Sequence, residues 1–254
     1  MRSRKSGFVV EEQGAGAPLI LLHGMASDHH TWDAIAPTLA QTRRVIRYDL
    51  RGFGQSPHPT QSYSHTDDLL QLMDERGIAC ADLLGVSWGA SIALHFALEH
   101  PERVNTLILE SPSMRGWDWS DDWRARAEAI EHAARTDSID AARALWLRHP
   151  MFDTLPAHAR TELAAAVARY SGRHWLGDDP HAPLAAPDLE RLPDLQAPTL
   201  LITGERDLED IRLIAEAIAA MAPNVTRVDI PDAGHLVHQE RPDAVLTAVT
   251  SFLR

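Results

Sequence analysis

Short runs of apolar residues recur along the chain, and each is bounded by Gly, Asp or Pro. Within the runs, apolar and polar positions do not alternate strictly, which is typical of strands buried on both faces of a mostly parallel sheet. The runs predict strands at residues 19–22, 45–48, 83–84, 104–109, 199–202 and 225–230.

Between these runs the apolar residues repeat with helical spacing. This spacing predicts helices at residues 66–76, 89–99, 209–221 and 242–253, and a proline opens the first turn of the last one. Strands and helices therefore alternate. This order indicates an α/β fold with a doubly wound, mostly parallel central sheet.

The alternation stops between residues 112 and 196, where no convincing strand pattern occurs. Helical patterns are present instead, and a proline-rich return follows them. We therefore expect a helical cap at residues 112–196, inserted into a core domain formed by residues 1–111 and 197–254. The cap helices are expected at residues 120–135, 139–148 and 156–170.

The residues Gly85-Val86-Ser87-Trp88-Gly89 form a G-x-S-x-G pattern between a predicted strand and a predicted helix. A sharp strand-to-helix turn strains its central residue and needs neighbours without side chains, a condition that Gly85 and Gly89 meet. The turn lifts the Ser87 hydroxyl clear of the backbone. It also places the Trp88 N–H at a helix N-terminus, where it can stabilise an oxyanion. The pattern predicts a nucleophilic Ser87.

A serine hydroxyl is a poor nucleophile near neutral pH, so it needs a histidine base and a carboxylate that orients the histidine. Asp207 and His235 each follow a predicted strand, which places both at the carboxyl edge of the sheet. We predict that Asp207 is the acid and His235 the base. Glu110, at the end of another predicted strand, is the alternative acid, and His238 is expected to be a surface or loop residue.

A further loop, His23-Gly24-Met25, directly follows the first predicted buried strand. Gly24 lets the backbone turn, so the Met25 N–H can join that of Trp88 in an oxyanion hole. We expect His23 to be a structural hydrogen-bonding residue beneath this loop. The turn at residues 49–56 is assigned a purely architectural role.

Tryptophan is concentrated in the expected cap, which holds five of the seven in the chain. In one interpretation these side chains bury aromatic surface against the core domain. In the other, Trp117, Trp119 and Trp123 line an apolar pocket above Ser87.

The formal net charge of −12 and the isoelectric point near 5.5 argue against nucleic acid or an anionic membrane as a partner. No apolar run reaches eighteen residues, and the run after the basic start is too short for a secretory signal. Cys80 is the single cysteine, so no intrachain disulfide is possible, and we expect a small core residue and a cytoplasmic protein. Adjacent His29 and His30 are expected to point apart, so no metal is expected. No cofactor is expected either.

Taken together, these motifs resemble the α/β-hydrolase fold superfamily, in its capped subgroup of small esterases, enol-lactonases and carbon–carbon-bond hydrolases. The resemblance covers nearly the whole chain outside the cap, and Ser87, Asp207 and His235 follow the family's order of nucleophile, acid and base. Two features depart from the family pattern. The stretch before residue 19 leaves little room for the usual opening hairpin, so the first strand is expected to be short or absent. Ala90 stands where many members have another glycine.

The resemblance implies a serine hydrolase that cleaves a small apolar carboxylic ester, a lactone or a related acyl or C–C bond. Ser87 in place of aspartate argues against haloalkane dehalogenases and epoxide hydrolases. Two alternatives stay open, namely a cofactor-free haloperoxidase or perhydrolase, which usually has methionine where Trp88 stands, and a ligand-sensing receptor on the same fold. The sequence leaves the substrate and the oligomeric state undetermined.

Overall fold

The computed structural model describes residues 7–177, 179–182 and 186–254, so the basic start of the chain and part of the proline-rich return lie outside it. The described strands form one seven-stranded sheet in the order β1-β3-β2-β4-β5-β6-β7. These strands are β1 (Val10–Gln13), β2 (Pro18–Leu22), β3 (Arg44–Tyr48), β4 (Ala81–Val86), β5 (Val104–Glu110), β6 (Thr199–Gly204) and β7 (Val225–Ile230).

All neighbouring strands pair in parallel except β1, which runs antiparallel to β3. The first strand is therefore present but short, with four residues. The predicted two-residue run at 83–84 lies inside β4, whose six residues are all buried. A doubly wound, mostly parallel sheet is confirmed.

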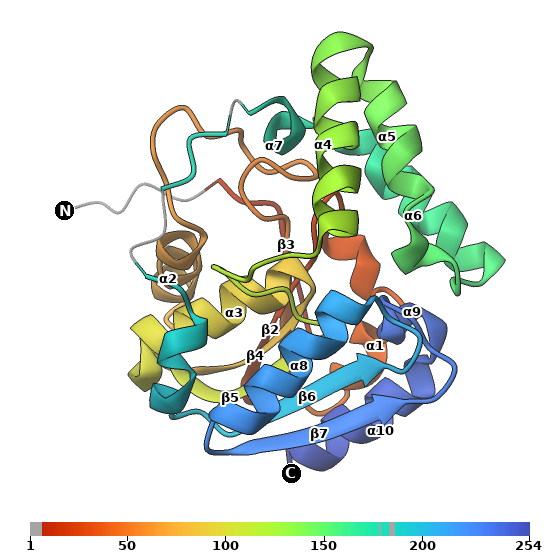
Figure 1. Ribbon diagram of the computed structural model, residues 1–254. Coiled ribbons are helices and arrows are strands. Elements are labelled where there is room, and N and C mark those ends of the chain that lie inside the picture. Colours follow the sequence, from red (N-terminus) through yellow and green to blue (C-terminus); the bar gives the residue numbers. More distant parts are fainter. Residues whose placement is uncertain (1–6, 178, 183–185) are drawn as a thin grey trace.

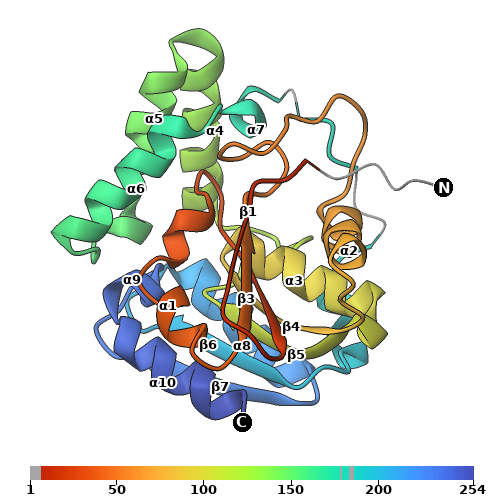
Figure 2. The same ribbon diagram turned by 180° about the vertical axis from the view of Figure 1, so that it is seen from behind.

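Helices cover both faces of the sheet (Figures 1 and 2). One face carries α2 (His65–Glu75), α3 (Trp88–Glu99) and α8 (Glu209–Met221), and the other carries α1 (Ala36–Leu39), α9 (Val237–Glu240) and α10 (Pro242–Phe252). The central helix α3 is buried from Gly89 to Ala97. An apolar helix of this kind fits only inside the protein, and it holds the strand-to-helix turn before it against the sheet.

The segment between β5 and β6, residues 112–196, is called the cap segment below. It contains α4 (Asp121–Thr136), α5 (Ile139–Leu147), α6 (Ala157–Arg169) and α7 (Arg173–Leu176), and α4 to α6 rise beyond the edge of the sheet in Figure 1. Serine side chains cap the N-termini of two of these helices. The Ser120 hydroxyl accepts a hydrogen bond from Trp123 N at 3.2 Å, and the Ser138 hydroxyl accepts one from Ala141 N at 3.1 Å. That this segment is a separate domain stays a prediction.

Cys80 is not the core residue that the sequence predicts. The residue is half-buried, and its Sγ donates a hydrogen bond to Asn105 Oδ1 at 2.8 Å. It lies just before β4, where the chain has not yet entered the sheet, and this explains the difference.

Close backbone contact joins the two loops that follow β6 and β7. A Cβ at Gly204 would overlap the carbonyl oxygens of Ala233 and Gly234. Arg206 N also donates to Ala233 O at 2.8 Å. The absent side chain at Gly204 thus lets the loop that carries Asp207 lie against the loop that carries His235.

Replacing Gly204 tests this contact. We expect Gly204→Ala to lower the free energy of unfolding by about 3 kcal/mol or more, because the new methyl group meets backbone that cannot move aside. Gly77→Ala is the control, since Gly77 has φ +64° but nothing within 4 Å of its added Cβ, and it should cost only about 1–2 kcal/mol. Urea denaturation measures both values. Equal losses in the two variants would contradict the interpretation.

Candidate active site

The turn between β4 and α3 has the geometry of a nucleophile elbow. Ser87 has φ +55° and ψ −118°, a strained conformation for a residue with a side chain. Its N–H donates to Glu110 O at 2.9 Å, which fixes the turn to β5. A Cβ at Gly85 would overlap the backbone of Gly89, and a Cβ at Gly89 would overlap the backbone at the end of β2, so both glycines are required.

Asp207 and His235 are brought together in the loops after β6 and β7. His235 Nδ1 lies 3.0 Å from each carboxylate oxygen of Asp207, and both side chains are buried. Since a carboxylate only accepts, the proton sits on Nδ1. Leu208 N also donates to Asp207 Oδ1 at 2.7 Å, which fixes the carboxylate.

The other nitrogen of the imidazole is available for chemistry. His235 Nε2 is buried and has no hydrogen-bond partner among the described residues. It belongs to a side chain that lines a small cavity of about 20 Å³ together with Ser87 and Gly24. Burial lowers the pKa of His235, but the charge and the hydrogen bond of Asp207, with help from Glu110 and Glu240, raise it above the ordinary value of 6.5.

The loop after β2 passes directly against the elbow. A Cβ on Gly24 would lie only 3.3 Å from Ser87 Cβ, so the following residue, Met25, is held close to Ser87. The Trp88 N–H is at the first position of α3, where the helix supplies no acceptor. These two N–H groups are those that the sequence predicts for the oxyanion hole.

His23 supports this loop from below. Burial lowers its pKa, so the neutral ring donates from Nδ1 to Gly24 O at 2.8 Å and accepts at Nε2 from Leu50 N at 3.0 Å. These contacts agree with the structural role that the sequence predicts for His23.

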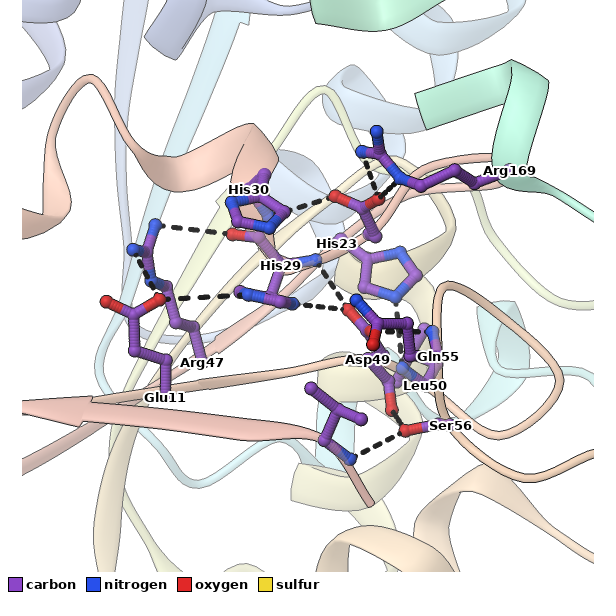
Figure 3. Close-up of polar contacts among 12 residues, drawn as sticks. Glu11, His23, His29, His30, Arg47, Asp49, Leu50, Gln55, Ser56 and Arg169 are labelled. Atoms are coloured by element: carbon purple, nitrogen blue, oxygen red, sulfur yellow. Dashed lines mark hydrogen bonds and ion pairs between the residues drawn. The ribbon is translucent and has the colours of Figure 1, made fainter. Parts of the chain in front are cut away.

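Asp49 organises the neighbouring turn, as Figure 3 shows. Its carboxylate accepts from His29 Nδ1 at 2.6 Å, His29 N at 2.9 Å and Gln55 N at 2.8 Å. Burial would raise the pKa of Asp49, but these hydrogen bonds outweigh it and hold the pKa at about 2. His29 is thus committed to Asp49, and within the described residues no three His, Cys, Asp or Glu side chains are grouped to hold a metal ion.

His238 is not the surface residue that the sequence predicts. It is fully buried in α9, where its N and Nδ1 donate to Glu110 Oε1 at 3.0 and 2.7 Å. Thr31 donates its hydroxyl to His238 Nε2 at 3.0 Å, and the ring lies 4.4 Å from that of Trp32. Periodicity could not reveal these contacts, because His238, Glu110 and Thr31 come from three segments that are far apart in the chain. Glu110, the alternative acid, is therefore hydrogen-bonded to His238 in place of His235.

A larger cavity of about 400 Å³ adjoins Ser87 beneath the cap segment. Trp119 and Trp123 line it, with their rings stacked at 4.3 Å. Trp117 is absent from its lining, and its Nε1 instead points to Asp210 Oδ1 of α8 at 3.4 Å. Trp146 and Trp175, two more of the five cap tryptophans, also line this cavity, whereas sequence reasoning did not identify the polar side chains Ser113, Arg115 and His174 of its wall.

Comparisons with known proteins agree with this geometry. Residues 17–242 match the model of the alpha/beta hydrolase fold family. The chain belongs to this family. None of the helices in the described part of the chain is long and apolar enough to cross a membrane.

Several of its relatives are named as hydrolases, and others are named as a synthase, a bromoperoxidase or a dehalogenase. The 3-oxoadipate enol-lactonase 1 of Acinetobacter baylyi is 25% identical, over 94% of this chain and 89% of that protein. A hydrolase from Pseudomonas aeruginosa has a similar structure, with a TM-score of 0.81 and 27% identity, over 97% of this chain and 94% of that one. For the enol-lactonase from Burkholderia xenovorans the TM-score is 0.77 and the identity 25%, over 97% and 96%. The chain is accordingly an α/β-hydrolase-family enzyme.

The stacked tryptophans give a prediction about chain-length selectivity. Trp119→Ala and Trp123→Ala remove apolar surface from the cavity wall, so each should raise KM for a long-chain 4-nitrophenyl ester by about tenfold relative to the acetate. Trp117→Ala is the matched control and should leave the ranking of chain lengths unchanged. Steady-state kinetics over a series of acyl lengths measures the effect. A changed order of preferred chain lengths in the Trp117 variant alone would contradict the assignment of Trp119 and Trp123, but not Trp117, to the cavity wall.

Proposed function

We propose that the enzyme is a serine hydrolase that cleaves a small carboxylic ester or lactone, or a related acyl or C–C bond, through a covalent acyl-enzyme on Ser87. The observation that carries the proposal is that a strained Ser87 and His235, whose Nε2 has no partner among the described residues, line the same small cavity. A nucleophile, a base and an orienting acid are the parts that acyl transfer needs.

In the first half of the reaction, His235 Nε2 takes the proton of the Ser87 hydroxyl as Oγ attacks the substrate carbonyl carbon. The carbonyl oxygen becomes an oxyanion, which the N–H groups of Met25 and Trp88 stabilise. When the tetrahedral intermediate collapses, the bond to the leaving oxygen breaks and His235 returns the proton to it. An ester releases an alcohol, whereas a lactone opens to a hydroxyacyl group that stays on Ser87.

In the second half, His235 takes a proton from water, and the resulting hydroxide attacks the acyl carbon. Collapse of this intermediate frees the acid and returns the proton to Ser87. Asp207 keeps the imidazole in the tautomer with Nδ1 protonated and stabilises the imidazolium, without itself taking the proton. Two of the similar proteins are named as enol-lactonases, which supports a lactone or ester as the substrate.

Removal of the nucleophile is the direct test. We expect Ser87→Ala to fold normally and to lower kcat/KM for 4-nitrophenyl esters at least about 10⁴-fold. A serine-directed phosphonate should label Ser87 alone. Ser111→Ala is the control, because Ser111 directly follows β5, the strand beside β4, and is buried yet lines neither cavity, so this variant should retain labelling and most activity. Labelling at another serine would contradict the proposal.

The two carboxylates are distinguished by substitution and by pH. Asp207→Asn should lower kcat/KM about a hundredfold more than Glu110→Gln does. The base must be neutral, so activity should rise with pH through the pKa of His235, with a midpoint above 6.5 in the unaltered enzyme. Without the Asp207 charge, burial is the main influence on the pKa of His235 and lowers it. The midpoint of the pH profile should therefore move to lower pH in Asp207→Asn. The reverse ranking of the two variants would identify Glu110 as the acid.

A further inference from the structure

Arg115 is held close to the proposed nucleophile by the backbone. It lines the 400 Å³ cavity with Ser87, in the loop that leads from β5 into the cap segment. Two residues earlier, Ser113 donates to the carbonyl oxygen of Ser87 from both its N–H, at 3.2 Å, and its hydroxyl, at 3.3 Å. Two residues span at most about 7 Å. The Arg115 carbonyl in turn accepts from Asp188 N at 3.2 Å, so the loop is fixed on both sides.

The guanidinium of Arg115 has a neutral partner. Its NH2 group donates to His181 Nε2 at 3.2 Å. Burial, and then the charge of Arg115, lower the pKa of His181, so this imidazole is uncharged. Within the described residues, Arg115 forms no ion pair with a carboxylate.

The two carboxylates whose charges act on Arg115 both contact His95, and the second oxygen of Asp188 is buried without a partner among the described residues. Asp188 accepts from His95 Nδ1 at 2.6 Å, and Glu99 lies 3.1 Å from His95 Nε2. Two further carboxylates, of which Glu131 lines the cavity, also have partners. Asp179 accepts from the Tyr63 hydroxyl at 3.1 Å, and Glu131, which is almost half exposed, pairs with Arg135 at 3.3 Å.

A cation in this position is incompletely compensated. Burial lowers the pKa of Arg115 despite the opposing charges of Asp188 and Glu99. Most other side chains of the cavity wall are apolar or aromatic, so they offer the buried guanidinium few hydrogen bonds in place of those it would make with water. The planar guanidinium presents a fork of N–H groups that fits a carboxylate at two points. An anionic group entering from solvent would complete the site.

We infer that the substrate carries a carboxylate that Arg115 binds, joined by a short apolar chain to the carbonyl that Ser87 attacks. The inference rests on the proposed function, since it places the reacting carbonyl at Ser87. It makes Arg115 a specificity-determining residue, and it narrows the substrate class to half-esters or lactones of dicarboxylic acids.

A matched pair of substrates tests it. Mono-4-nitrophenyl adipate and 4-nitrophenyl hexanoate have acyl chains of equal length and differ in a terminal carboxylate against a methyl group. The unaltered enzyme should prefer the adipate in kcat/KM. Arg115→Met should lower the adipate-to-hexanoate ratio about ten- to a hundredfold, chiefly through KM, because it removes a charged hydrogen-bond partner.

The control is Arg124→Met. Arg124 is half-exposed on α4, pairs with Asp118 and Asp121 and is absent from the cavity wall, so its loss should leave the ratio unchanged. Arg115→Lys, which keeps the charge but loses the fork, should fall between the unaltered enzyme and Arg115→Met. A preference of the unaltered enzyme for the hexanoate ester would overturn the inference. So would an adipate-to-hexanoate ratio in Arg115→Met equal to that of the unaltered enzyme. Each result is decisive by itself.

Binding without turnover separates this inference from the proposed function. Adipate itself should bind the Ser87→Ala protein and quench its tryptophan fluorescence, since Trp88 and Trp119 line the cavity, and the second change Arg115→Met should abolish this binding. If neither ester is hydrolysed but adipate binding requires Arg115, the hydrolase proposal fails and the carboxylate site stands. If both esters are hydrolysed and adipate does not bind, the hydrolase stands and the carboxylate site is wrong.

Discussion

Contact between bare backbones at the carboxyl edge of the sheet is the constraint on which the rest of the site depends. Gly85, Gly89 and Gly204 stand where any Cβ would overlap a neighbouring carbonyl or peptide group. Because these side chains are absent, the elbow sits against the end of β2 and the loop after β6 sits against the loop after β7. Four loops from distant parts of the chain thereby converge around Ser87, and the strain at Ser87 is maintained by the packing of β4, β5 and α3.

Buried imidazole–carboxylate pairs then stiffen this edge. His235 pairs with Asp207, His238 with Glu110, and His29 with Asp49, each within 3.0 Å. A buried charge is costly unless it is paired and hydrogen-bonded, and in each pair the carboxylate accepts at least one backbone N–H as well. His235 alone of the three has a ring nitrogen left buried without a partner among the described residues, as the base that we propose would require.

The fold could be predicted, and Ser87 could be singled out as a candidate nucleophile, because both follow from local rules. Apolar runs, helical spacing and the glycines of the elbow are properties of neighbouring residues, and they led to the parallel sheet and to Ser87. His238 and Cys80 could not be predicted in this way. Whether each is buried depends on which segments pack over it: α9 carries His238 onto Glu110, whereas Cys80 precedes the sheet and stays half-buried.

The sequence by itself thus determined an α/β-hydrolase fold and the order of its motifs, because the spacing of apolar residues and the residues that form turns depend only on neighbouring positions in the chain. The tertiary structure alone decided which tryptophans meet a cavity, since Trp119 and Trp123 line it while Trp117 turns to Asp210. It also decided that Arg115 lines that cavity and that its guanidinium donates to the neutral His181. Both outcomes depend on how the cap segment packs against the sheet, and that packing joins residues too far apart in the chain for any periodicity to relate them.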